Sequence, residues 1–342
     1  MTQIKVDNIA DAAGTGAPDF EDGLTVAGSA ISTLNTAEYY ESGTEPSSPK
    51  NGAIWKDTAN DKLMMYIAGE FKEIELGAGG ASGWIADVAN FSNATSETFS
   101  VASQETTPRD VVFNADGTKM YIVGQASDSI LQYSLSTAFD VSTASYDSVS
   151  YNPLGSNQHA LRFNSDGTKF YNLSSPVLYQ YSMSTAYDVS TASYDSVNFD
   201  FTSNSSSPYA FDISPDGTKL IVVSFIDDVV TQYTMSTAFD LSTLSYDSIS
   251  LDVSTNSPSC YGISWSANGG ALYLNDTVVG EIVQYLCSTA FDISTATYDA
   301  AYDYSNSNTI NNGSGVAFNA DGSKLYLVSS GTDTVYTLLT GL

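Results

Sequence analysis

Short apolar segments separated by Asp-Gly turns recur along the chain from residue 109 to the C-terminus. The first copy reads RDVVFNADGTKMYIVG, and ILQYSL, the connection STAFDVST and the segment SYDSVSY follow it. An Asp-Gly pair between two apolar segments is a strong signal for a β-hairpin. Each copy is therefore expected to form four short strands, which in the first copy lie at residues 110–114, 119–123, 130–135 and about 146–151.

The repeat has a period near 50 residues. A glutamine marks its register at intervals of 48 to 52 residues, at Gln132, Gln180, Gln232 and Gln284. This period fits a β-propeller blade and is too long for leucine-rich or ankyrin repeats. The fifth copy stops after its third strand, at residues 335–339, whereas residues 98–102 have the character of an unpaired fourth strand. We therefore predict an all-β fold in which residues 84–342 form a five-bladed β-propeller, with the last blade closed by strands from both ends.

The residues before the propeller carry no such repeat. Residues 14–28 are rich in Gly and Ala with isolated apolar residues, and residues 1–36 are expected to form an extended anchor segment. Residues 37–76 are expected to form a small β domain, with strand signals at 53–56, 63–67 and 71–76. Residues 77–83 (GAGGASG) read as a flexible hinge. Segments too thin to fold alone usually fold on a partner or as an oligomer.

Charge excludes several classes of partner. The chain has 39 acidic residues against 11 Lys and Arg, which gives a net charge of −28. Nucleic acid and anionic membrane surfaces are therefore unsuitable partners, because both need clustered cations. No apolar run is long enough to span a membrane, and the N-terminus lacks the apolar core of a signal peptide. Cys260 and Cys287 are too few for a disulfide framework and are expected to be buried thiols.

Acidic residues are the only serious candidates for catalysis. Glycoside hydrolysis needs two carboxylates in different environments, whereas here the aspartates recur in register from copy to copy. A turn residue obeys the repeat, and a catalytic residue breaks it. We therefore expect turn chemistry from these aspartates, no catalytic residues and no enzyme activity. They are Asp140, Asp188, Asp240 and Asp292 in the STAFD connection, and Asp147, Asp195, Asp247 and Asp299 in the SYDS segment.

His159, the single histidine, is expected to have a surface or packing role. No metal site and no cofactor are predicted, since no D-x-D-x-D-G run exists and the nearest acidic cluster is the pair Asp227 and Asp228. Calcium stays open, because the many loop carboxylates suit hard cations.

Aromatic residues are candidates for sugar binding. A tyrosine begins the fourth strand of each copy and is flanked by Asp and Ser, which suits the C–H face and the hydroxyls of a sugar. Packing explains these rings equally well. They are Tyr146, Tyr194, Tyr246 and Tyr298.

Two segments of the sequence resemble known protein families. The repeat VxFxxDGTKxYxV…QYxxS resembles the blades of YVTN- and lactonase-type β-propellers. The N-terminal 80 residues resemble the N-terminal regions of virion fibre and appendage proteins of tailed bacteriophages, particularly marine ones. The pattern that carries this second resemblance is Pro-x-x-Gly-x-x-Trp-x-Asp-x-x-x-x-x-Leu, matched by Pro49, Gly52, Trp55, Asp57 and Leu63. The chain lacks the extended shaft of long fibres, which leaves open whether it sits on a tail or on a head.

The phage resemblance implies a virion structural protein. It would be made in the host cytoplasm, sit on the virion surface as a tail fibre or receptor-binding appendage, and display the propeller for adhesion to the host. Its partners would be other virion proteins, through residues 1–83, and a host surface glycan or protein. A homo-oligomer is expected, with a trimer favoured. The apolar residues expected to anchor it are Ile4, Val6, Ile9, Phe20, Leu24 and Val26.

Two alternatives remain. The first is a capsid decoration or head-fibre protein that stabilises the particle. The second is an enzyme that degrades surface glycans, against which the repeated carboxylates and the single histidine argue.

Overall fold

The computed structural model describes residues 84–304, 310 and 312–342, and residue 53 together with seven short strands before residue 84. The chain forms two compact units, residues 1–78 and 79–342. The boundary lies inside the Gly-rich segment 77–83. No helix in this described part of the chain is long and apolar enough to cross a membrane.

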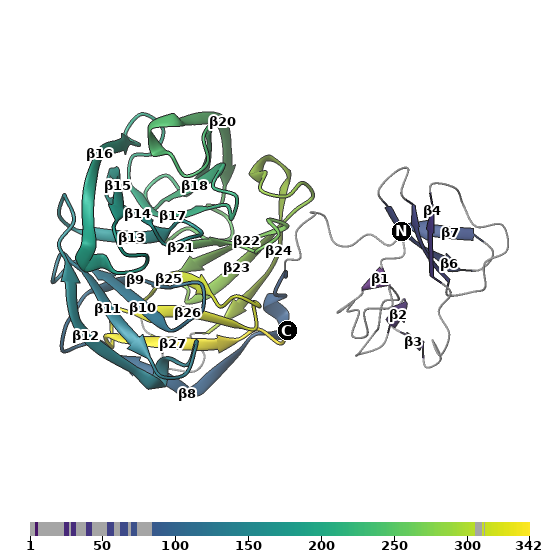
Figure 1. Ribbon diagram of the computed structural model, residues 1–342, viewed down its shortest axis with the longest axis horizontal. Helices are drawn as coiled ribbons and strands as arrows, with labels where there is room; N and C mark the ends of the chain where they lie inside the picture. The colour runs from purple at the N-terminus through teal and green to yellow at the C-terminus, as the bar shows by residue number, and fades with distance from the viewer. Residues whose placement is uncertain are drawn as a thin grey trace. The chain divides into compact units, whose positions relative to one another are not determined.

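Residues 84–342 form a five-bladed β-propeller, as the repeat predicts (Figure 1). Each blade is a four-stranded antiparallel sheet, and four of the blades use consecutive strands. The first two blades contain β9 (Pro108–Phe113), β10 (Lys119–Gly124), β11 (Ile130–Leu135), β12 (Ala144–Tyr151), β13 (Gln158–Phe163), β14 (Lys169–Ser174), β15 (Val177–Met183) and β16 (Ala192–Asp200). The next two contain β17 (Pro208–Ile213), β18 (Lys219–Ser224), β19 (Val229–Met235), β20 (Leu244–Asp252), β21 (Cys260–Trp265), β22 (Ala271–Asp276), β23 (Glu281–Cys287) and β24 (Ala296–Asp303).

Strands from both ends of the propeller build the fifth blade. Three strands near the C-terminus, β25 (Gly313–Phe318), β26 (Lys324–Ser329) and β27 (Thr334–Leu339), are completed by β8 (Ser92–Ser100). β8 pairs antiparallel with β27, and Phe99 lies opposite Val335. The predicted closure is therefore confirmed, although the closing strand begins at Ser92 rather than at residue 98.

The closing segment also contains a loop that the sequence analysis missed. In the first blade, Asp140 caps the short 3-10 helix η2 (Val141–Thr143) by accepting the N–H of Ser142. Asp87 caps η1 (Val88–Asn90) in the same way. The propeller thus begins with a whole connection, and the match between IADVAN and AFDVST was the signal in the sequence.

An aromatic ring covers the glycine of each Asp-Gly turn. Gly117 has φ +69°, and a Cβ placed there would lie 2.2 Å from the ring of Phe139 in the STAFD connection. In the fifth blade the ring over Gly322 belongs to Trp84. The turn therefore requires glycine both for its left-handed backbone and for the close approach of the ring.

Hydrogen bonds from the repeated tyrosine and glutamine hold each blade to the next. The hydroxyl of Tyr326 in the fifth blade donates to the carbonyl of Phe139 in the first at 2.6 Å. The side-chain carbonyl of Gln132 accepts the N–H of Val189 in the second blade at 3.2 Å. The side-chain carbonyls of Gln180, Gln232 and Gln284 likewise accept the backbone N–H groups of Leu241, Ile293 and Val88, respectively. The residues that recur in the repeat therefore include those that form contacts between blades as well as those that form the strands.

The described strands within residues 1–78 form two small sheets. The first has the order β1-β2-β3, with β1 (Ile4–Lys5), β2 (Leu24–Val26) and β3 (Ser29–Ile31). The second has the order β4-β5-β6-β7, with β4 (Tyr39–Ser42), β5 (Ile54–Asp57), β6 (Lys62–Ile67) and β7 (Glu70–Glu73). Strands thus lie within the segment 1–36 that was expected to be extended. The division into anchor, small domain and hinge stays a prediction.

The proposed anchor residues fall partly outside the described chain. The backbone of Ile4 lies in β1, opposite Val26 in β2, and Leu24 begins β2. Val6, Ile9 and Phe20 lie outside the described residues.

Candidate functional site

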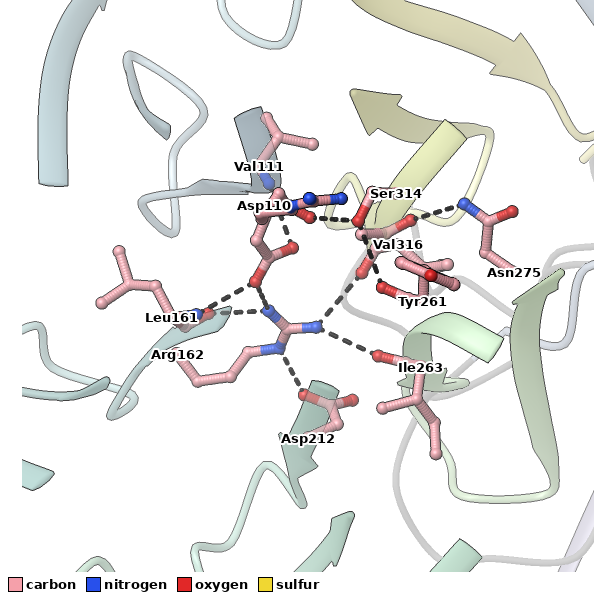
Figure 2. A network of polar contacts seen from close by, with 12 residues as sticks. Asp110, Val111, Leu161, Arg162, Asp212, Tyr261, Ile263, Asn275, Ser314 and Val316 are labelled. Carbon is pink, nitrogen blue, oxygen red and sulfur yellow. Dashed lines mark hydrogen bonds and ion pairs between the residues drawn. The ribbon is translucent and has the colours of Figure 1, made fainter. Parts of the chain in front are cut away.

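The five inner strands β9, β13, β17, β21 and β25 surround the axis of the propeller, and Arg162 from β13 lies among them (Figure 2). A guanidinium group has five N–H donors, and here each of them has an acceptor, one from every blade. The acceptors are Asp212 (2.8 Å from Nε), Asp110 and the carbonyl of Leu161 (both 2.7 Å from Nη1), and the carbonyls of Ile263 (3.0 Å) and Val316 (3.3 Å) around Nη2. The guanidinium group of Arg162 is therefore hydrogen-bonded to all five blades.

The two carboxylates beside Arg162 have further partners in neighbouring blades. Asp110 accepts the N–H of Leu161 at 3.0 Å, and Asp212 accepts the N–H of Trp265 at 2.8 Å. Burial acts to lower the pKa of Arg162, but the two carboxylates outweigh it, so that its pKa lies above the usual value. Burial raises the pKa of Asp110, and Arg162 acts in the opposite direction. This is a saturated structural centre rather than a pair of carboxylates free for catalysis.

A cavity of about 280 Å³ lies at the end of the channel near the Asp-Gly turns. Its wall contains the aromatic rings of Phe113, Phe163 and Phe318, with Arg162 and Ser264 among the polar residues. Because every donor of Arg162 is already bonded, the guanidinium has none left for an anion in this cavity.

The opposite end of the channel is built differently. There the second residue of each inner strand varies from blade to blade, and a β-bulge marks this position in β9, β13, β17 and β21. The five residues are Arg109, His159, Tyr209, Tyr261 and Ser314. By the criterion that functional residues break a repeat, this ring is the strongest candidate site in the described chain.

Arg109 is poorly satisfied compared with Arg162. The described residues accept only one of its donors, the Nη2 group, which bonds the side-chain carbonyl of Gln125 at 2.8 Å. Its Nε atom is buried without a partner. The guanidinium lies over the ring of Tyr209, 5.7 Å from the centroid. Arg109 thus keeps unused donors at a partly exposed position.

Aromatic rings surround Arg109. His159 meets the ring of Tyr209 edge-on at 4.2 Å, Tyr209 contacts Tyr261 at 4.3 Å, and Tyr261 contacts Phe225 at 4.9 Å. His159 is 9% exposed, and its Nδ1 atom has no partner. Burial, with a smaller contribution from Arg109, lowers the pKa of His159 to about 4. The imidazole is therefore neutral near pH 7, and His159 packs against Tyr209, which is one of the two roles expected for it.

The loops at this end differ among blades, whereas the Asp-Gly turns are nearly the same. The connections between second and third strands read QASDS, SP, FIDD, TVVG and SGTD, while four of the five turns read NADGT, NSDGT, SPDGT and NADGS. These variable loops expose large apolar side chains, including Ile226 (67% exposed) and Val278 (76% exposed). We call this end, where the inner strands begin, the variable face.

Four of the eight aspartates expected to serve turns do so in the structure, whereas the four of the SYDS segment lie in the outer strands instead. Asp140, Asp188, Asp240 and Asp292 each cap a 3-10 helix by accepting an N–H two residues ahead. Asp147 accepts hydrogen bonds from Lys119 (2.7 Å), Ser134 and Gln132 within its own blade. Asp195 and Asp247 likewise accept bonds from Gln180 and Gln232, and Asp299 lies in β24.

The four tyrosines considered for sugar binding lie on the outermost strands of four different blades. The structure therefore does not bring them together. Each ring packs against the tyrosine of the third strand, at 5.3 Å for Tyr146 and Tyr133 and at 5.9 Å for Tyr298 and Tyr285. Tyr298 is 48% exposed, whereas Tyr146, Tyr194 and Tyr246 are partly buried. Sugar binding by these rings stays a prediction.

Cys260 and Cys287 are both buried and free, as predicted. Asp227 is occupied with loop bonds, since it accepts from Ser206 and Ser224. Among the described residues, no group of three or more His, Cys, Asp and Glu side chains could hold a metal ion.

Sequence reasoning missed Arg109 and Arg162 as site residues. The signal was present, because these are the only two arginines in the 342 residues and neither recurs in the equivalent position of another copy.

Comparisons with known proteins give matches among solved structures only. No protein-family model and no curated protein matches the chain. Among solved structures, similar chains include a protein of unknown function from Desulfotomaculum acetoxidans (12% identity, TM-score 0.41, covering 65% of this chain and 62% of that one). A Bacteroides uniformis protein proposed to be a 6-phosphogluconolactonase has 12% identity and a TM-score of 0.43, covering 68% of this chain and 67% of that one. A β-propeller domain from Myceliophteria thermophila has 9% identity and a TM-score of 0.45, covering 73% of this chain and 99% of that one.

Proposed function

We propose that this chain is a virion appendage protein of a tailed bacteriophage, of the tail-fibre or receptor-binding type. In this proposal, residues 1–83 attach the protein to other virion proteins, and the propeller is displayed on the virion surface to bind the host. The protein binds its target and does not cleave it. Segments too thin to fold alone usually fold on a partner or as an oligomer. The attached form in this proposal is therefore a homo-oligomer, with a trimer favoured.

The observation that carries the binding function is the contrast between the two faces of the propeller. One face repeats the same turns, and the other presents different residues from every blade, including Arg109 and Tyr261. A rigid scaffold with variable loops at one end is a common design for recognition. The virion location is supported by the sequence pattern around Pro49, Gly52 and Trp55.

Adhesion fits the described carboxylates better than catalysis. Asp110 and Asp212 share Arg162, and the repeated aspartates cap helices or bond within their blades. A glycosidase needs a carboxyl with a raised pKa beside an ionised one, both able to reach the scissile bond. Incubation of the protein with host surface polysaccharide should therefore release no new reducing ends. Sustained release that one carboxylate substitution abolishes, without loss of folding, would favour the glycan-degrading enzyme.

Mass spectrometry and labelled-antibody microscopy of purified particles test the virion assignment. The full chain should be found in particles at a tail or surface appendage, and a chain lacking residues 1–78 should be absent from them while keeping its melting temperature. Label spread over the capsid would favour the decoration protein. Absence of the full chain from particles, or incorporation of the truncated chain, would refute the proposal.

A further inference from the structure

The variable face has a cationic centre in a strongly acidic protein. Of the six cationic residues in 84–342, Arg162, Lys119, Lys219 and Lys324 form ion pairs. Arg109 and Lys169 have no ion pair among the described residues, and Lys169 donates to the carbonyl of Phe239. Arg109 is therefore a charge without a counter-charge, at the end of the channel where the blades differ.

The donors of Arg109 are held in place rather than free to move. Gln125 fixes the Nη2 group, and the guanidinium carbon lies over the ring of Tyr209, 5.7 Å from its centroid. The Nη1 group has no hydrogen bond among the described residues. A guanidinium fixed in this way presents a planar fork that matches a carboxylate.

The side chains around Arg109 suit a ring-shaped ligand. Tyr261 and Phe225 are partly exposed, and their rings lie 4.9 Å apart. Aromatic faces of this kind cover the C–H surface of a sugar. The nearly buried His159 has an unpartnered Nδ1 atom in the same cluster.

We propose that Arg109, Tyr261 and Phe225 form a binding site for an acidic sugar, in which the guanidinium binds the sugar carboxylate and the rings contact the sugar ring. This inference rests on the proposed function, because it names the class of host ligand that the displayed propeller would recognise. It also explains how a chain with a net charge of −28 could bind an anionic glycan. The long-range repulsion is screened at high ionic strength, whereas the short-range contact with Arg109 remains.

Calorimetric titration of the full chain with sodium glucuronate tests the site. The work is done at about 0.5 M salt, where the screening length is only about 4 Å. Glucose has the same ring without the carboxylate, and acetate has the carboxylate without the ring. We expect glucuronate to bind at least about tenfold more tightly than either, since both contacts contribute. Equal affinity for glucuronate and glucose, or for glucuronate and acetate, would overturn the proposal.

Variants of Arg109 and Tyr261, with a control at Lys169, test whether glucuronate binds at the proposed site. Arg109→Gln should lower the affinity for glucuronate at least about tenfold, and Tyr261→Ala should lower it while leaving the weak binding of acetate unchanged. Lys169→Gln removes the same charge beside an Asp-Gly turn, at the opposite face of the propeller, and should change nothing. Unchanged affinity in Arg109→Gln, or an equal loss in Lys169→Gln, would refute the site.

A measurement on the unaltered chain covers the case in which a variant does not fold. Glucuronate should raise the melting temperature of the wild-type protein at concentrations where glucose and acetate do not. No such rise would count against the site.

The outcomes separate this inference from the proposed function. If the protein is present in virions and binds host cells equally well with Arg109→Gln, the acidic-sugar site is wrong and the virion assignment stands. If the protein binds glucuronate through Arg109 but is absent from virions, the acidic-sugar site stands and the virion assignment is wrong.

Discussion

Arg109 and Arg162 lie on neighbouring inner strands of one propeller, and their surroundings differ in almost every respect. Arg162 has acceptors for all five donors, two of them carboxylates, from all five blades. Arg109 has one amide acceptor and an aromatic ring. The same side chain therefore serves as a structural centre in one place and leaves binding capacity unused in the other.

This difference shows how a repeat protein can separate stability from recognition. Arg162, the turn aspartates and the glutamines between blades all form their hydrogen bonds with partners inside the fold. The side chain of Arg109 on the variable face takes no part in these bonds, so a substitution there leaves them intact. The comparison predicts opposite consequences for substitutions at the two ends of the channel.

Loss of Arg162 should have the largest effect. Arg162→Leu leaves Asp110 and Asp212 without their cation, and breaking a buried ion pair in this way costs about 3–5 kcal/mol. Chemical denaturation of the variant should show this loss in the free energy of unfolding. Lys119→Met is the matched control, since it breaks the partly exposed pair with Asp147 and should cost about 1 kcal/mol or less. Equal losses in the two variants would show that Arg162 is not a structural centre.

Acid should destabilise the variable end through His159. Its pKa is lowered to about 4 by burial and by Arg109, so the folded state favours the neutral imidazole. As the pH falls from about 6.5 to about 4, the unfolded chain takes up a proton that the folded chain does not, and stability is lost. The loss from this residue is about 3 kcal/mol.

His159→Phe should remove this part of the pH dependence of unfolding. The charged and titratable neighbours that face His159 are Arg109 on β9 and Tyr209 on β17, and neither changes its charge in that range. Parallel curves for the wild type and the variant between pH 7 and 4 would contradict the assignment.

The structural features that recur in every blade could be predicted from the sequence, whereas the features found in a single blade could not. Asp-Gly turns, glutamine spacing and the truncated last copy were sufficient for five blades and their closure, because each blade reports the same local geometry. The loop at Trp84 and Asp87 escaped notice because it matches AFDVST at few positions. The site at Arg109 depends on a bulge that shifts the register of β9, and on contacts between strands about 50 to 100 residues apart. Neither the bulge nor these contacts can be read from the local periodicity of the sequence.

Thiol reactivity should show whether the variable end opens on its own. Cys260 is the first residue of β21, next to Tyr261, and burial raises the pKa of both Cys260 and Cys287 to about 12. Both thiols should therefore be unreactive toward a thiol reagent at pH 8 and should react fully after unfolding without reductant. Faster reaction of Cys260 in the folded protein, identified by peptide mass spectrometry, would show that the few bonds at this end permit local opening.

Loss of Arg109 should have the smallest effect on stability. Arg109→Gln removes one hydrogen bond to Gln125 and the contact with Tyr209, and it also removes a buried Nε atom that has no partner. These contributions oppose one another, because an unsatisfied buried donor is itself unfavourable. The free energy of unfolding should change by less than about 1 kcal/mol, within the range of ordinary surface substitutions. A loss comparable with that of Arg162→Leu would mean that both arginines support the ring, and the division between a structural and a binding end would then fail.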